Sequence, residues 1–184
     1  MMHKPFVITI VGPESSGKST LAEAWAFTLG CPWVPEFARE YLQLNGPTYT
    51  EEDLTFIAEG QRQRIQHHLD SGLFPLISPD QFQGLTFGEK SAIFSPLESF
   101  GEVNRPVLIV DSGMISIRLW AKIKYGKSIP VLDELLYEDP TSLYVVCRPV
   151  LPWEADPLRE APDILDRAWI YNLYLKELGI IQRL

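Results

Sequence analysis

A segment close to the N-terminus constrains the fold of this chain more than any other. It reads Gly12-Pro13-Glu14-Ser15-Ser16-Gly17-Lys18-Ser19 and matches the phosphate-binding pattern G-x-x-x-x-G-K-[ST] at every fixed position. The apolar run at 6–11 predicts a buried strand before it, and a helix is expected from Ser19 until Gly30 ends it. Backbone N–H groups and a helix N-terminus then converge on one point, which suits a nucleoside triphosphate. The alternative is a chance match in a Gly/Ser turn.

The rest of the chain alternates between extended and helical patterns. Apolar runs at 106–111 and 142–147 predict two further strands, and the tail at 180–184 is a candidate last strand. Helices are expected over 50–72, 112–124 and 163–178. The alternation predicts an α/β protein, a three-layer P-loop NTPase fold with a mostly parallel five-stranded sheet. The length of 184 residues favours a single domain over residues 1–184.

The stretch at about 73–105 does not fit this alternation. It is too long for an ordinary loop in a compact domain and too rich in apolar residues for plain disorder. We expect an ordered insertion with a short helix or hairpin, packed over the site or against a partner chain. A surface embellishment without a role is the alternative.

Composition limits the classes of partner. The chain has 16 Lys and Arg against 24 Asp and Glu, a net charge of −8, which argues against nucleic acid as the main ligand. No apolar run reaches the length of a membrane span, and the N-terminus has no signal-peptide pattern. The two cysteines and three histidines lack metal-ligand spacing. These observations predict a cytoplasmic protein without a membrane or nucleic-acid partner, and they leave its oligomeric state open.

Two acidic residues are expected at the carboxyl edge of the sheet. Asp111 ends the strand at 106–111, where a Walker-B carboxylate holds Mg²⁺. Glu36 follows the short extended piece at 32–35, where a carboxylate can accept a hydroxyl proton or hold a sugar hydroxyl. Arg39 lies one helical turn later and is expected to face the same cleft. The alternative for Glu36 and Arg39 is an exposed salt bridge at a helix start.

The proline-rich segment at 149–162 is a candidate lid. It is flanked or occupied by Arg148, Arg159 and Arg167, and arginines that close over a γ-phosphate neutralise its charge and exclude water. Scattered surface charge is the alternative. Gln61 falls on the apolar stripe of the helix expected at 50–72, so it is either a buried amide or a hydrogen-bonding residue aimed at the substrate.

Four strings of sequence resemble one family when they are taken together. GPESSGKSTL, PEFAREYL, VDSG and PWEADPLR resemble the ribosylnicotinamide kinase domain of NadR-type proteins and related P-loop ATPases and kinases. The similarity spans nearly the whole chain except the insertion. One departure is that the second acid of the family's D-T-D strand end is Gly113 here. The acids of the insertion, including Asp80, Glu89, Glu98 and Glu102, are candidate replacements.

The resemblance implies a kinase-like domain that uses ATP and Mg²⁺ and transfers the γ-phosphoryl group to a nucleoside, with nicotinamide riboside as the favoured acceptor. A kinase for another nucleoside or nucleotide, and a regulatory ATPase or switch, remain open. The expected catalytic residues are Lys18, Glu36, Asp111 and Arg159. The expected ATP-binding residues are Gly12, Glu14, Ser15, Ser16, Gly17, Lys18, Ser19, Thr20, Arg148, Arg159 and Arg167. The expected acceptor-binding residues are Glu36, Arg39, Gln61 and Asp156, and the expected Mg²⁺ ligands are Ser19 and Asp111.

Overall fold

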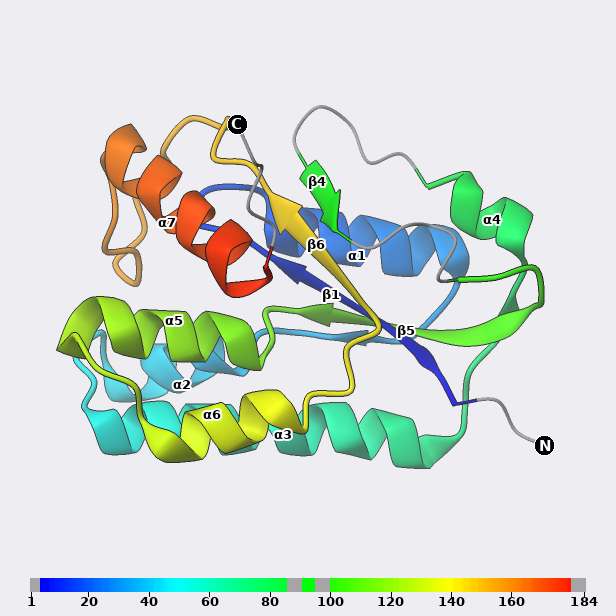
Figure 1. Ribbon diagram of the computed structural model, residues 1–184, viewed down its shortest axis with the longest axis horizontal. Coiled ribbons are helices and arrows are strands. Elements are labelled where there is room, and N and C mark those ends of the chain that lie inside the picture. Colours follow the sequence, from blue (N-terminus) through cyan, green and yellow to red (C-terminus); the bar gives the residue numbers. More distant parts are fainter. Residues whose placement is uncertain (1–3, 86–90, 95–99, 180–184) are drawn as a thin grey trace.

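The computed structural model describes residues 4–85, 91–94 and 100–179 (Figure 1). Its elements, in chain order, are β1 (Phe6–Val11), α1 (Lys18–Leu29), β2 (Trp33–Val34), α2 (Phe37–Asn45), α3 (Glu51–Ser71), β3 (Leu76–Ile77), α4 (Pro79–Gln83), β4 (Ser91–Phe94), β5 (Arg105–Asp111), α5 (Met114–Tyr125), α6 (Pro130–Tyr137), β6 (Leu143–Cys147) and α7 (Ile164–Glu177). The candidate strand at 180–184 lies outside the described residues.

The described strands form a mostly parallel sheet in the order β2-β5-β1-β6-β4. Strand β1 lies in the middle and pairs in parallel with β5 and β6, and β2 pairs in parallel with β5. Strand β4 joins the edge of β6 in antiparallel orientation, and β3 pairs antiparallel with the start of β5. The predicted fold class is therefore confirmed: an α/β P-loop fold with a mostly parallel five-stranded sheet.

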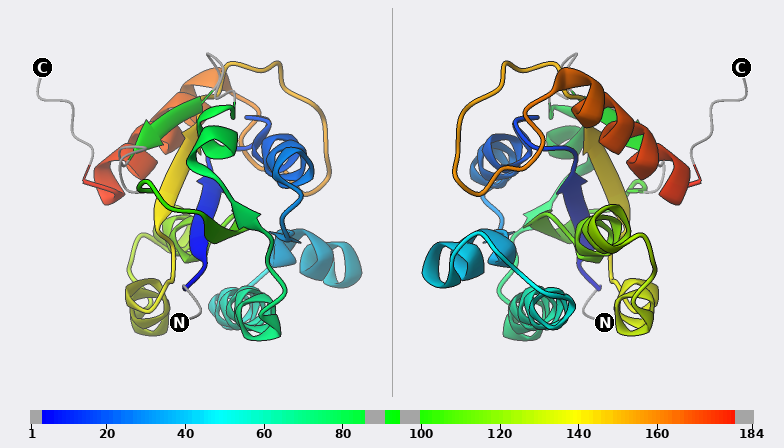
Figure 2. Two further views of the ribbon diagram at one scale, coloured as in Figure 1. Left: turned by 90° about the vertical axis from the view of Figure 1, so that its right-hand side faces the viewer. Right: turned by 90° about the vertical axis from the view of Figure 1, so that its left-hand side faces the viewer.

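Helices cover both faces of this sheet (Figure 2). Phe6, Ile8 and Ile10 of β1 pack in one cluster with Trp25 and Leu29 of α1. The opposite face of the sheet packs against α3, α5 and α7. Every residue of β1 is buried, because a central parallel strand is covered on both sides. This is why its sequence is a continuous apolar run without alternation.

The ends of the long helices follow their sequence signals. Helix α1 ends at Gly30, whose φ is 65°, and α3 ends at Gly72, whose φ is 63°. Helix α3 begins with a capping box in which Thr50 and Asp53 bond each other's backbone N–H. These predicted bounds are confirmed. Helix α6 was not predicted, because its eight residues are too few to show a clear helical spacing of apolar positions.

The insertion at about 73–105 contains β3, α4 and β4 in its described part. Phe82 stacks on Phe100 with ring centroids 4.2 Å apart, and both rings meet Phe6 at the start of β1. The start of β1 is the opposite end of the strand from the phosphate-binding loop. The described part of the insertion thus contains a short helix and two strands, and these aromatic contacts lie away from the loop instead of over it.

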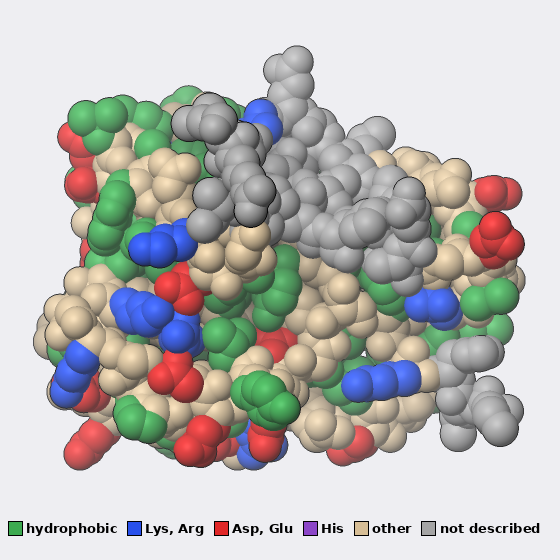
Figure 3. Space-filling model, viewed as in Figure 1, with side chains coloured by type: hydrophobic (Ala, Val, Ile, Leu, Met, Phe, Trp, Pro, Cys, Tyr) green, Lys and Arg blue, Asp and Glu red, His purple; other side chains and the backbone are tan. Residues whose placement is uncertain are grey.

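Charged side chains of both signs are interspersed on the face shown in Figure 3. Arg118 of α5 forms ion pairs with Asp133 of α6 and Glu177 of α7, and Lys122 pairs with Glu177 at 2.8 Å. Positive charge in this region is therefore paired across helices and is not gathered into a basic patch. Within the described residues, no helix is both long and apolar enough to span a membrane.

Gly60 of α3 lies against the ring of Phe37, at the start of α2. A Cβ built on Gly60 would lie 2.4–2.7 Å from three ring atoms of Phe37. Phe37 is the first residue of α2, which carries the expected site residue Arg39 and is preceded by Glu36. The glycine therefore sets how deeply the start of α2 sits on the fold.

We predict that Gly60→Ala lowers the stability of the protein by about 1–3 kcal/mol, because the new methyl group overpacks the Phe37 ring. Thermal unfolding measures the effect. Gly84→Ala is the control, since Gly84 has a right-handed φ of −69° and its Cβ would meet nothing closer than 3.4 Å. Equal stability changes in the two variants would contradict the close-packing role of Gly60.

Candidate functional site

The phosphate-binding loop connects β1 to α1 and is shaped by two glycines. Gly12 has a φ of 151°, and a Cβ there would lie 2.8 Å from the carbonyl oxygen of Cys147 at the end of β6. Gly17 has a φ of 79° and directly precedes Lys18, the first residue of α1. Ser15 between them also has a positive φ, 52°. Only glycine adopts the positive φ angles of positions 12 and 17 without strain, which explains why the motif has glycine at both positions.

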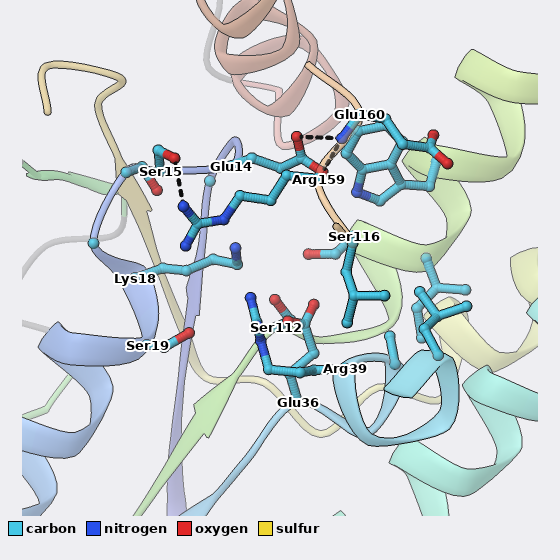
Figure 4. Close-up of a pocket in the computed structure, with 18 of the residues that line it drawn as sticks. Glu14, Ser15, Lys18, Ser19, Glu36, Arg39, Ser112, Ser116, Arg159 and Glu160 are labelled. Carbon is cyan, nitrogen blue, oxygen red and sulfur yellow. Dashed lines mark hydrogen bonds between the residues drawn. The ribbon is translucent and has the colours of Figure 1, made fainter. Parts of the chain in front are cut away.

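A cavity of about 300 Å³ opens beside this loop. In Figure 4, Lys18 from α1 and Arg39 from α2 reach toward the same space, and Arg159 lies across it near Ser15. The expected site residues that line the cavity are Gly12, Glu14, Ser15, Ser16, Gly17, Lys18, Ser19, Thr20, Glu36, Arg39 and Arg159. Segments distant in sequence therefore meet around one volume, as the sequence predicted for the carboxyl edge of the sheet.

Asp111 lies below this cavity at the end of β5. Its side chain is buried, and its Oδ1 has no hydrogen-bond partner among the described residues. Burial raises the pKa of Asp111 to about 6, and the nearby Glu36 carboxylate adds to the rise, whereas Lys18 and a hydrogen bond with Ser19 oppose it. A buried carboxylate oxygen without a partner, next to a hydroxyl, is a donor set that suits Mg²⁺.

The segment at 149–162, which we call the lid segment, lies across the phosphate-binding loop. Arg159 donates from Nη1 to the Ser15 Oγ at 2.9 Å and to the Glu154 carbonyl at 2.8 Å. Arg39 donates to the Asp156 Oδ2 at 3.0 Å and so joins α2 to the lid segment. The backbone N–H of Leu158 and this arginine lower the pKa of Asp156. The structure thus places the predicted lid and its Arg159 at the nucleotide side of the cavity.

Besides Asp111, four of the expected residues do not line the cavity. The buried Gln61 accepts the Phe37 N–H at 2.7 Å and holds the start of α2. Arg167 is buried and donates to the Leu151 carbonyl at 3.0 Å, beneath the lid segment. Arg148 is exposed at the end of β6. Asp156 faces Arg39 as described. This geometry gives Gln61 and Arg167 roles in positioning other elements and brings neither to the ligand space.

The far half of the cavity was not predicted from the sequence. Its apolar and aromatic lining comes from α2, α3, α5 and the segment before α3, and consists of Ala38, Leu42, Tyr49, Leu54, Ile57, Ile117 and Trp120. Ser116 and Tyr174 add hydroxyl groups that bond each other at 3.0 Å. In the sequence these apolar residues have the spacing of core positions. Only the fold reveals that they surround a space.

Gly113, where the family pattern has an acid, is closely packed. A Cβ there would lie 2.8 Å from the Thr9 Cγ2 and 3.4 Å from the Asp139 Oδ2. The Asp139 carboxylate comes from the segment before β6, and its Oδ1 accepts hydrogen bonds from the N–H and the hydroxyl of Thr141. Its Oδ2 has no hydrogen-bond partner among the described residues, and burial raises the pKa of Asp139. Asp80 and Glu102 of the insertion do not line the cavity. Glu89 and Glu98 lie outside the described residues.

Comparisons with known proteins agree with this architecture. Residues 7–74, from β1 through α3, match the family model of the AAA domain, which implies nucleotide binding. The chain is 25% identical over 178 residues to the trifunctional NAD biosynthesis/regulator protein NadR of Salmonella typhimurium, and 26% identical over 182 residues to that of Escherichia coli. Each match covers 95% of this chain and 37% of the relative, so the chain spans well under half of the curated relatives' length. The resemblance inferred from the motifs is confirmed as a distant relationship.

Solved structures of NadR have the same fold. NadR in complex with NR superposes with a TM-score of 0.64 at 18% identity, and NadR in complex with NAD and AMP-PNP with 0.65 at 19% identity. Both matches cover 98% of this chain and 43% of the solved chain. At this identity the likeness establishes the fold.

We predict that Asp111→Asn stabilises the ligand-free protein at neutral pH. The folded-state pKa of about 6 lies above an ordinary carboxyl value, so this group favours folding at low pH and that stability is lost as pH rises through 6. Removing the charge should restore about 3 kcal/mol at pH 8 but only about 1 kcal/mol at pH 4.5, where the folded carboxyl is protonated and the unfolded one is already mostly ionised.

Urea unfolding in EDTA at the two pH values measures this difference. Asp70→Asn on the exposed side of α3 makes the same charge change and is the control. If Asp111→Asn and its parent lose stability in parallel between pH 4.5 and 8, the raised pKa of Asp111 is contradicted.

Proposed function

We propose that this chain is an ATP-dependent kinase that transfers the γ-phosphoryl group to a hydroxyl of a small nucleoside, with nicotinamide riboside as the favoured acceptor. The nucleotide side of the proposal rests on the phosphate-binding loop and the match to the AAA-domain model. The acceptor side rests on the cavity and on the relationship to NadR.

One observation favours a kinase over a switch. The cavity beside the phosphate-binding loop is also lined by apolar and aromatic side chains, among them Tyr49 and Trp120, and by Glu36 and Arg39. A switch or regulatory ATPase needs a place for the nucleotide and its attacking water. An apolar lining with aromatic side chains suits a planar base and would leave room for an acceptor beside the phosphates.

The charged side chains take complementary roles in this proposal. Lys18 and Arg159 neutralise the phosphate oxygens, because charge spreads over them as the phosphoryl group moves. Glu36 accepts a hydrogen bond from the acceptor hydroxyl and then its proton. Its carboxylate lies at the N-terminus of α2, where Arg39 follows one turn later and holds the lid segment through Asp156.

Mg²⁺ fits the end of β5. Asp111 and Ser19 would hold the ion, directly or through water, and they satisfy its preference for oxygen ligands. When bound, the ion supplies positive charge that shields the β- and γ-phosphates. It would also offset the cost of burying the Asp111 carboxylate beside Glu36.

We predict that Lys18→Ala weakens ATP binding roughly 10- to 100-fold, since a charge-assisted contact to phosphate is lost. Calorimetric titration with ATP and Mg²⁺ measures the affinity. Lys176→Ala, an exposed lysine on α7, removes the same charge far along the chain and should bind ATP like the parent. Parent-like affinity in Lys18→Ala would remove the phosphate-binding loop from the nucleotide site.

We predict that Glu36→Gln lowers phosphoryl transfer about 100-fold or more while ATP affinity changes little, because its partner is the acceptor hydroxyl. The assay incubates ATP with nicotinamide riboside and a panel of nucleosides and detects the phosphorylated product by mass spectrometry. Glu52→Gln, an exposed carboxylate on α3, is the control. Slow ATP hydrolysis by the parent, with no phosphorylated acceptor in the panel, would favour the switch.

A further inference from the structure

The carboxylate of Glu14, in the phosphate-binding loop, is already hydrogen-bonded within the protein. Its Oε1 and Oε2 accept the backbone N–H of Glu160 at 3.0 and 2.9 Å, and Oε2 also accepts the N–H of Ala161 at 2.8 Å (Figure 4). Both oxygens are thus engaged by the C-terminal part of the lid segment. The sequence placed Glu14 among the ATP-binding residues, and the geometry gives it a different partner.

The Glu14 carboxylate that makes these contacts is partly buried. Burial raises the pKa of Glu14, whereas the N–H groups of Ala161 and Glu160 and the charge of Lys18 lower it. A carboxylate removed from water is stabilised when N–H groups point at it. The lid segment supplies those donors from two successive residues, so releasing it would leave the carboxylate without its partners.

Arg159 directly precedes the peptide group that Glu14 holds. Because the Glu160 N–H is fixed on Glu14, the backbone of Arg159 stays next to the phosphate-binding loop, and its side chain reaches the Ser15 Oγ at 2.9 Å. Ser15 also accepts the Glu154 N–H at 3.4 Å. Glu14 and Ser15 therefore hold both ends of the turn that carries Arg159.

A second connection holds the lid segment to α2, but it is weaker. The Arg39–Asp156 ion pair spans 3.0 Å, and the arginine side chain is 42% exposed. Exposed ion pairs contribute little because water and salt screen them. The Glu14 contacts use backbone donors, which leave only if the lid segment itself moves. Arg167 holds the other end of the segment through the Leu151 carbonyl, so Glu14 restrains the part that carries Arg159.

We propose that Glu14 is a positioning residue that holds the lid segment on the phosphate-binding loop and so keeps Arg159 over the transferring phosphate. The kinetic consequence rests on the proposed kinase function, whereas the contact between loop and lid does not. Glu14 contributes to transfer through Arg159, and ATP binding in the ground state depends on it only weakly.

The test compares Glu14→Gln and Glu14→Asp with the parent and with Glu23→Gln, an exposed carboxylate on α1. Glutamine has the size of glutamate, but its NH₂ group cannot accept hydrogen bonds from the N–H groups of the lid segment. Aspartate keeps the negative charge but is one methylene shorter. Limited trypsin digestion is followed by mass spectrometry at the Arg159–Glu160 bond, with and without ATP and Mg²⁺. The same proteins are assayed for ATP affinity, kcat and KM, and thermal unfolding.

We expect both Glu14 variants to be cut at Arg159–Glu160 roughly 10-fold faster or more without ATP, at an unfolding temperature close to the parent's. We also expect kcat to fall roughly 10- to 100-fold while ATP affinity and KM stay within about threefold, as when an interaction made in the transition state is lost. Glu23→Gln should match the parent in every assay.

Two results would overturn the proposal: parent-like cleavage at Arg159–Glu160 in both folded Glu14 variants, or a loss of ATP affinity as large as the loss of kcat. The proteolysis is independent of catalysis. If the parent phosphorylates no acceptor but Glu14 variants are cut faster, the kinase function fails and the hold of Glu14 on the lid segment stands. If Glu14→Gln unfolds, cleavage in the charge-preserving Glu14→Asp decides.

Discussion

Strand β1 pairs in parallel with β5 on one side and β6 on the other, and the position of every other site element follows from this pairing. Ile10 lies opposite Asp111, and Val11 lies opposite Val146. The three strands therefore end at the same edge, where the phosphate-binding loop, the Asp111 carboxylate and the lid segment leave the sheet together. Because the register of a parallel sheet is fixed by burial on both faces, this edge is held rigidly. The phosphate-binding loop and the lid segment are therefore anchored on a rigid edge of the sheet.

The ligand-free cavity keeps like charges close together. The Asp111 carboxylate is buried, and Glu36 raises its pKa further, while the positive charges of Lys18 and Arg39 oppose this rise. In the absence of a ligand this arrangement opposes folding at neutral pH. In the proposed function, a nucleotide with its cation would offset that cost at binding, so part of the affinity comes from relief of repulsion already present. A site organised in this way gives up stability for the pre-positioning of charge.

The sequence predicted the parts of the fold that have local signals. Helix α3 has a capping box at Thr50 and a glycine at position 72, and the buried strands are apolar runs, so their bounds needed no tertiary information. Contacts between distant segments had no such signal. Glu14 lies inside a nucleotide-binding motif, yet its partners are the N–H groups of Glu160 and Ala161. Backbone donors leave no trace in side-chain chemistry, so no pattern announces them. The apolar half of the cavity was missed because its residues have ordinary core spacing.

Gly113, where the resembled pattern has an acid, shows how the residue at one position depends on packing against another segment. The N-terminus of α5 favours a nearby carboxylate, because its first N–H groups lack helical partners. Here the Asp139 carboxylate, from the segment before β6, occupies the space beside Gly113, and the nearby Met114 backbone lowers the pKa of Asp139 against the effect of burial. An acid at position 113 would collide with Thr9 and repel Asp139. The absence of a side chain at position 113 and the position of the Asp139 carboxylate therefore depend on each other. A comparison made position by position records only the loss of an acid at 113, whereas the fold shows that a carboxylate from a distant segment lies against that position.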